Sequence, residues 1–68
     1  MKYKAAYMHK DSGAIECGFE IDANTDEMAV LLARTEERRR FSAMELFGLH
    51  EVTGTANNGI DLIRSVKY

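Results

Sequence analysis

The stretch that most constrains this fold is residues 21–41, because it carries the sustained helical pattern of the chain. Its side chains recur at the spacing of one helix face: Met28, Leu31, Leu32 and Thr35, widened by Ala29 and Ala33. Asn24 is expected to cap the helix, with Glu27 three residues later returning the hydrogen bond. The sequence therefore predicts one main helix with an amphipathic stripe.

Residues 2–10 and 14–22 are expected to form two strands of a hairpin. Residues 14–22 alternate between apolar and polar side chains, as a half-buried strand does. A three-residue loop, Asp11-Ser12-Gly13, would place Gly13 at the position that needs a positive φ. This loop predicts four cross-strand pairs: Tyr3 with Ile21, Lys4 with Glu20, Ala5 with Phe19 and Tyr7 with Cys17.

The end of the chain predicts a second hairpin, turning at Asn57-Asn58-Gly59. Its strands are placed near residues 45–55 and at 60–67, and Val52 is expected to pair with Arg64. Residues 42–48 allow two interpretations. A capping box at their start favours an extra short helix ending at Gly48, followed by a loop and the strand. The alternative is that this segment is itself strand.

These elements predict a small α+β domain spanning residues 1–68, with the order ββαββ. A four-stranded antiparallel sheet made of two hairpins, with the helix packed across one face, is the economical arrangement. The chain is 46% hydrophobic and 29% charged, which is ordinary for a globular domain. A single cysteine, no signal peptide and no long apolar run favour a cytoplasmic protein that does not enter a membrane. An initial Met without a visible tag favours a complete small gene product.

The run Arg38-Arg39-Arg40 is the most obvious candidate for recognition of a charged partner. Together with Lys2 and Lys4 it could hold phosphates, which makes nucleic-acid binding an alternative function. Two observations oppose this interpretation. The formal net charge is -2, and cations at a helix C-terminus are also expected simply to complement the helix dipole and pair with Glu36.

No arrangement of residues in the sequence predicts catalysis, a metal or a cofactor. His9, His50 and Cys17 are scattered singly, whereas a zinc site needs ligands in close pairs. Cys17 falls in an apolar row and is expected to be buried, away from any nucleophilic role. The acidic residues of 14–22 look like a solvated sheet face, so we expect no enzyme.

The sheet face away from the helix is a candidate interface. If the helix covers the face of Phe19 and Val66, shared with Ile15 and Leu62, then Met8, Leu49 and Ile63 point away from it. Apolar side chains ringed by charges on a sheet surface resemble a small protein interface, although singly exposed apolar residues are also normal. The charged helix face is expected to contribute as well, through Glu36, Glu37, Arg38 and Arg40.

Lys4-Ala5-Ala6-Tyr7 and the overall size resemble small phage-encoded inhibitors, including some anti-CRISPR proteins. This resemblance implies a protein that blocks the surface of a partner. The leading hypothesis is therefore a non-enzymatic protein-binding module, an inhibitor or adaptor from a phage or other mobile element. The alternatives are the nucleic-acid accessory protein described above and a structural homodimer.

Overall fold

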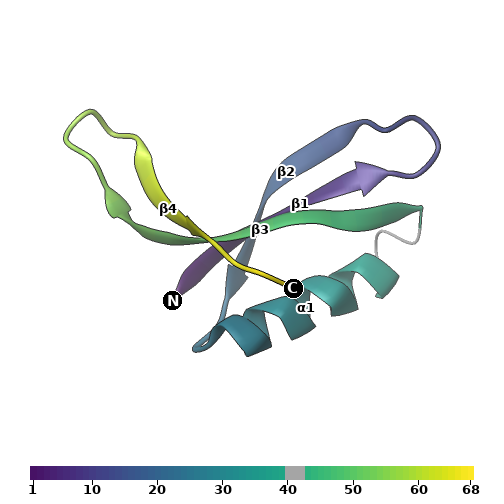
Figure 1. Cartoon of the computed structure of the whole chain (residues 1–68), viewed down its shortest axis with the longest axis horizontal. Coiled ribbons are helices and arrows are strands. Elements are labelled where there is room, and N and C mark those ends of the chain that lie inside the picture. The colour runs from purple at the N-terminus through teal and green to yellow at the C-terminus, as the bar shows by residue number, and fades with distance from the viewer. Residues whose placement is uncertain (40–42) are drawn as a thin grey trace.

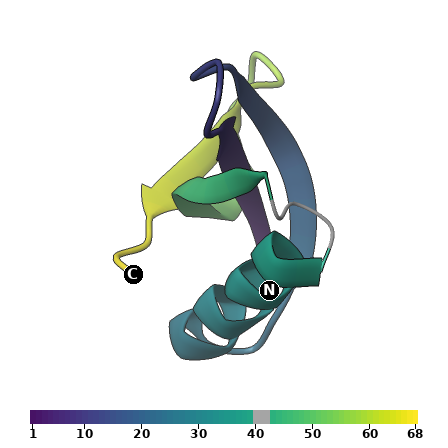
Figure 2. The same ribbon diagram turned by 90° about the vertical axis from the view of Figure 1, so that its right-hand side faces the viewer.

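The computed structural model describes residues 1–39 and 43–68. The elements, in order, are β1 (Lys2–His9), β2 (Ile15–Asp22), α1 (Asp26–Arg39), β3 (Met44–Thr55) and β4 (Asp61–Ser65). The strands form one four-stranded antiparallel sheet in the order β2-β1-β3-β4. The helix lies against one face of this sheet (Figures 1 and 2). The predicted α+β fold with ββαββ order is therefore confirmed.

β1 supplies the centre of the core. Tyr3, Ala5 and Tyr7 alternate along the strand and are almost completely buried beneath the helix. Both phenol groups are paired: Tyr3 donates to Asp26 Oδ1 at 2.7 Å, and Tyr7 donates to the backbone carbonyl of Ala33 at 3.0 Å. The two tyrosines therefore tie β1 to both halves of α1.

The helix packs on the sheet through Ala29 and Ala33, the small residues of the predicted stripe, and not through its larger apolar residues. Ala29 and Ala33 are 0% exposed, whereas Leu31 is 57% and Met28 is 46% exposed. The physical reason is that the rings of Tyr3 and Tyr7, both fully buried, already fill the space between β1 and the helix. Alanines let the helix approach these rings, and larger side chains at the same positions would not fit.

The helix start is also one residue later than predicted. The hydroxyl oxygen of Thr25 accepts a hydrogen bond from the backbone N–H of Met28 at 3.1 Å, so Thr25 is the N-cap. The predicted capping box between Asn24 and Glu27 is wrong, because the side chain and the backbone carbonyl of Thr25 accept the hydrogen bonds that begin the helix.

The first hairpin turns through a loop one residue longer than predicted. The backbone N–H of His9 donates to Ala14 at 2.8 Å, which leaves residues 10–13 in the loop. Gly13 has the expected positive φ, at 74°. The pairs at the open end are as predicted: Tyr3 with Ile21, Lys4 with Glu20 and Ala5 with Phe19.

Each pair of neighbouring strands contains one register shift, and each shift lies beside a glycine. Cys17 and Gly18 together face Ala6, so Tyr7 pairs with Glu16 rather than with Cys17 as predicted. Gly18 has a φ of 88°, a conformation that residues with a Cβ rarely adopt. Extra residues in a ladder bend and twist the strand. The tips of the two hairpins accordingly splay apart on the side away from the helix (Figure 1).

β3 contains the other two extra residues, Phe47 beside Gly48 and Thr53 beside Gly54. The shift at Thr53 makes Val52 pair with Ile63, so the predicted pairing of Val52 with Arg64 is wrong. A shift of one residue moves side chains to the other face of a sheet. From Val52 towards the start of β3, side chains therefore lie on the opposite face from the one predicted relative to β4.

The segment before β3 is not the extra helix that was favoured for residues 42–48. Ala43 lies in a turn, and the strand begins at Met44. Met44 and Leu46 are buried, and both pair with the end of β1. Burial of alternate residues against β1 overrides the local capping signal. Ser42, the first residue of the predicted cap, lies outside the described residues.

Candidate protein-binding surface

The outer side of α1 carries exposed apolar side chains. Met28, Leu31 and Leu32 all point away from the core, and we call these three residues the outward stripe. Thr35 lies one turn after Leu31, and its hydroxyl donates a hydrogen bond to the backbone carbonyl of Leu31 at 2.8 Å. Large apolar side chains gathered on one exposed face are typical of surfaces that a partner covers.

A groove of about 340 Å³ runs between α1 and the edge strand β2. Its apolar lining comes from Phe19 and Ile21 of β2, Leu32 of α1 and the ring of Tyr7. The rings of Tyr7 and Phe19 meet edge to face, with their centroids 5.2 Å apart. Because Leu32 belongs to both features, the groove and the outward stripe form one continuous surface.

The polar groups around the groove are mainly acidic. Glu36 of α1 contributes a carboxylate and Arg39 contributes a guanidinium. Glu20 and Asp22 border the groove at the edge of β2, where their side chains alternate with those of Phe19 and Ile21 and lie towards the other face of the sheet. The nearby cations are held loosely on the surface: the Lys2 ammonium is 3.7 Å from Glu20, and the N-terminal amine is 3.3 Å from Asp22. Exposed pairs of this kind contribute little free energy, so a partner could compete for these carboxylates.

A chain of hydrogen bonds fixes the first turn of the helix to the sheet. Asp26 accepts from Tyr3 and from Arg64, both at 2.7 Å. Arg64 in turn donates to Glu51 at 2.9 Å and 3.1 Å. The network links β1, β3, β4 and α1, so it holds the N-terminal end of the helix, and with it the outward stripe, in a fixed position.

This network changes the pKa of its members. Burial, followed by the hydrogen bond to Asp26, raises the pKa of Tyr3 to about 12. The hydrogen bond from Arg64, followed by the one from Tyr3, lowers the pKa of Asp26 below its ordinary 3.8. The same contacts to Asp26 and Glu51 raise the pKa of Arg64.

We expect the network to lose its stabilising effect at both ends of the pH scale. Asp26 stabilises the fold above its ordinary pKa of 3.8, and this contribution disappears as the pH falls through the lower pKa of the folded state. Tyr3 behaves oppositely: its contribution is complete below pH 10 and is lost as the pH rises towards about 12. Urea unfolding across these ranges should show a weaker acid dependence in Asp26→Asn and a weaker alkaline dependence in Tyr3→Phe. Asp11→Asn, in the exposed turn, is the control and should follow the wild type.

The residues predicted for the charged helix face divide into two groups. Glu37 points to the sheet, where its carboxylate accepts from the backbone N–H of Leu46 and from Arg34. Glu37 therefore has a structural role: its carboxylate binds the backbone of β3 at Leu46, where β4 does not pair with β3. Glu36 lines the groove, and Arg38 is exposed. Arg40 lies outside the described residues.

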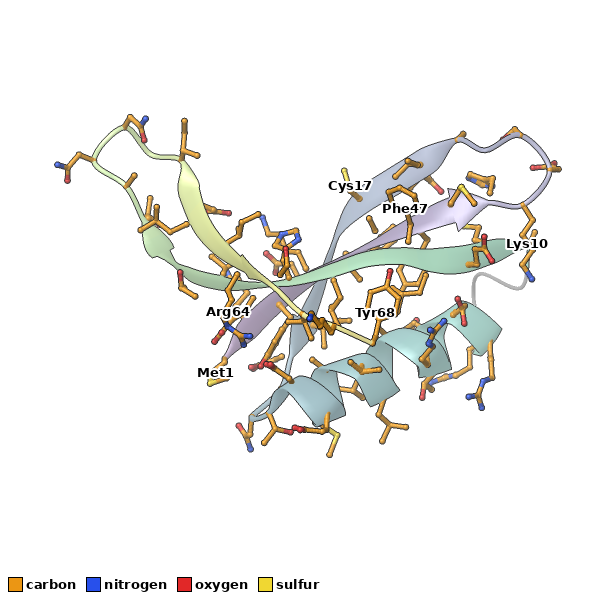
Figure 3. All side chains as sticks on the ribbon, viewed as in Figure 1. Met1, Lys10, Cys17, Phe47, Arg64 and Tyr68 are labelled. Atoms are coloured by element: carbon orange, nitrogen blue, oxygen red, sulfur yellow. The ribbon has the colours of Figure 1, made fainter. Side chains whose placement is uncertain are left out.

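The sheet face away from the helix carries only part of the predicted interface. Ile63 is 57% exposed and Met8 is half-buried, but Leu49 is 4% exposed and belongs to the core. Leu49 pairs with Ala5, beneath the helix, because the register shift at Thr53 exchanges the faces. Phe47 lies on the side of the sheet away from α1 (Figure 3). Leu49 is therefore removed from the candidate binding residues.

Three other side chains that were predicted to be buried are exposed. Ile15 and Leu62, predicted to lie under the helix, are both exposed, whereas Val66 is buried as expected. Cys17, predicted to be buried, is exposed at the register shift of β2. Burial of the thiol therefore no longer argues against reactivity.

The cations of the nucleic-acid alternative do not form one patch in the described residues. Lys2 and Lys4 lie at the start of β1, near the helix N-terminus, and each is paired with a carboxylate: Glu20 at 3.7 Å and Asp61 at 3.3 Å. Arg38 and Arg39 lie in the last turn of α1. A helix of 14 residues is roughly 20 Å long, so the two groups are separated by about its length.

Within residues 1–39 and 43–68, no group of three or more His, Cys, Asp or Glu side chains could hold a metal ion. No helix of the described chain has the length and apolar character needed to span a membrane. Comparison with protein-family models, with curated proteins and with solved structures finds no match for this chain.

Sequence reasoning missed the groove, although a signal for it was present. The alternation of Tyr3, Ala5 and Tyr7 placed two large rings on the helix-facing side of β1. Two rings there require small residues four apart on the helix, which identifies Ala29 and Ala33 as the contact. The larger apolar residues must then lie on the outside.

Proposed function

We propose that this chain is a non-enzymatic protein-binding module that covers a partner's surface with the outward stripe and the adjoining groove. The observation that carries the proposal is the inverted use of the helix. Its alanines are buried while Met28, Leu31 and Leu32 are exposed, so the protein leaves the largest apolar side chains of the helix in water. Binding a partner would remove this apolar surface from water, which is the main favourable term in most associations.

The size of the chain supports the same proposal. A domain of 68 residues buries a smaller fraction of its surface than a larger domain does, so it gains more from an added partner. The resemblance of residues 4–7 to small phage-encoded inhibitors makes blocking of a partner the specific form that we propose. Nucleic-acid binding through Arg38–Arg40 is less well supported, because Lys2 and Lys4 lie at the other end of the helix and are paired.

The test is capture of a partner from nuclease-treated lysate of the source cells, compared between the wild type and Leu31→Asp. A charge at the centre of an apolar interface typically costs 2 kcal/mol or more, so we expect binding to weaken by about thirtyfold or more. Leu31 is exposed, so the variant should fold normally, which circular dichroism would verify.

Ile63→Asp is the matched control, because Ile63 is equally exposed but lies on β4. Loss of the partner with Ile63→Asp and not with Leu31→Asp would move the interface to the outer sheet face. Capture that requires intact nucleic acid would favour the arginine run instead. A stable species of twice the chain mass by light scattering, with no other protein bound, would favour a homodimer.

A further inference from the structure

The edge of β2 is the longest free strand edge next to the candidate surface. β2 has eight residues and pairs with β1 on one side, and the described part of the chain places no strand on its other side. An open edge presents backbone N–H and C=O groups that can bind an additional strand. The other edge strand, β4, is five residues long and lies at the far end of the sheet from the groove.

The groove lies next to the edge of β2, on the face of the sheet that the helix covers. A strand added to β2 would direct every second side chain towards Phe19, Ile21 and Leu32, which form the apolar lining. The volume of about 340 Å³ is at the small end of the range for binding pockets. It therefore suits a few apolar side chains of an extended segment.

The opposite side of the same edge is acidic. Glu20 and Asp22 alternate with Phe19 and Ile21, and Glu20 pairs with Lys4 on the sheet face away from the helix. The whole of β2 carries three carboxylates and no basic residue. The remaining side chains of an added strand would therefore lie beside carboxylates, where lysine or arginine is favoured.

The same charges argue against a second copy of this chain as the occupant. Pairing β2 with β2 of another copy would bring Glu16, Glu20 and Asp22 near their equivalents. Like charges facing each other across a sheet are destabilising. The register shift at Cys17 and Gly18 also interrupts the edge, which leaves Phe19–Asp22 as its regular part.

We propose that the edge of β2 binds an extended segment of the partner in which apolar residues alternate with lysine or arginine. The segment adds a strand beside Phe19–Asp22, with its apolar side chains in the groove and its cations beside Glu20 and Asp22. This inference rests on the proposed protein-binding function and names the chemistry of the partner.

The probe is an acetylated and amidated peptide of about ten residues in which leucine alternates with lysine. The comparison peptide has glutamate in place of lysine. We expect the lysine peptide to bind at least about tenfold more tightly than the glutamate peptide, as measured by fluorescence anisotropy. Hydrogen exchange of the backbone amides of Phe19–Asp22 should slow on binding. A third peptide, N-methylated at every residue, has no backbone donors on either edge and should bind more weakly.

Two double variants with the same net charge separate a specific site from general attraction. Glu20→Lys with Asp22→Lys should reverse the preference, so that the glutamate peptide binds better. Asp11→Lys with Glu45→Lys changes exposed residues elsewhere and should keep the preference of the wild type. Equal effects of the two double variants would overturn the proposal, as would equal binding of all the peptides or no binding.

Failure of this inference is distinguishable from failure of the proposed function. If Leu31→Asp releases the captured partner while Glu20→Lys with Asp22→Lys does not, the protein-binding function stands and the strand-addition mode is wrong. If exchange slows on the helix and not at Phe19–Asp22, the peptide occupies the outward stripe and the mode is again wrong.

Discussion

Tyr7→Ala should be strongly destabilising, lowering the free energy of unfolding by about 3–5 kcal/mol. Tyr7 is 1% exposed, packs edge to face on Phe19 and is hydrogen-bonded to the helix. A domain of this length has a total stability of roughly 3–10 kcal/mol. The variant is therefore expected to be substantially unfolded at 25 °C, as measured by urea denaturation followed by circular dichroism.

Tyr7→Phe is the matched variant for this experiment. It keeps the ring and removes only the hydroxyl that donates to the Ala33 carbonyl, so the expected loss is about 1 kcal/mol. The difference between the two variants gives the contribution of the buried ring. Similar losses in both would mean that the hydrogen bond, and not the packing of the ring, dominates at this position.

The second large effect is expected for Ala33→Leu, which inserts a large side chain at the contact between the helix and β1. Ala33 is 0% exposed beside Tyr7, and overpacking of a filled site costs about 1–3 kcal/mol. The midpoint of urea denaturation should therefore fall well below that of the wild type. Because the helix must move away from the sheet, the groove between α1 and β2 should also change shape, and peptide binding there should weaken.

Leu31→Ala is the reciprocal control, since it exchanges the same two residue types on the opposite side of the helix. Leu31 is exposed, and Leu and Ala are both strong helix formers, so its effect on stability should stay within about 0.5 kcal/mol. A stable Ala33→Leu together with a destabilised Leu31→Ala would show that the larger side chains of the predicted stripe, and not its alanines, contact the sheet.

The element order and the pairs nearest the open end of the first hairpin could be predicted because they depend on local patterns. Alternation in β2 and turn residues such as Gly13 and Gly59 act over a few positions. The register beyond each extra residue could not be predicted in this way. It depends on where an irregularity falls, and Leu49 changed faces because Thr53 adds one residue to β3.

The candidate site was harder to predict than the fold, because it depends on which helix face wins the contact with the sheet. Hydrophobic periodicity alone favours Leu31 and Leu32 as core residues. The helix face that contacts the sheet is instead determined by the volume of Tyr3 and Tyr7 on β1. This is a tertiary contact that the helix sequence alone does not reveal. The paired tyrosines and the paired alanines had to be considered together.

The three extra residues in the sheet allow shape and core to change independently during evolution. Cys17, Phe47 and Thr53 are all exposed, and each lies where the ladder carries one residue too many. Deleting any one of them would restore regular pairing without moving the pairs on either side. A lineage could therefore alter the angle between the two hairpin arms by single-residue insertions and deletions. The buried tyrosines and alanines would keep their places while the outline of the molecule changes.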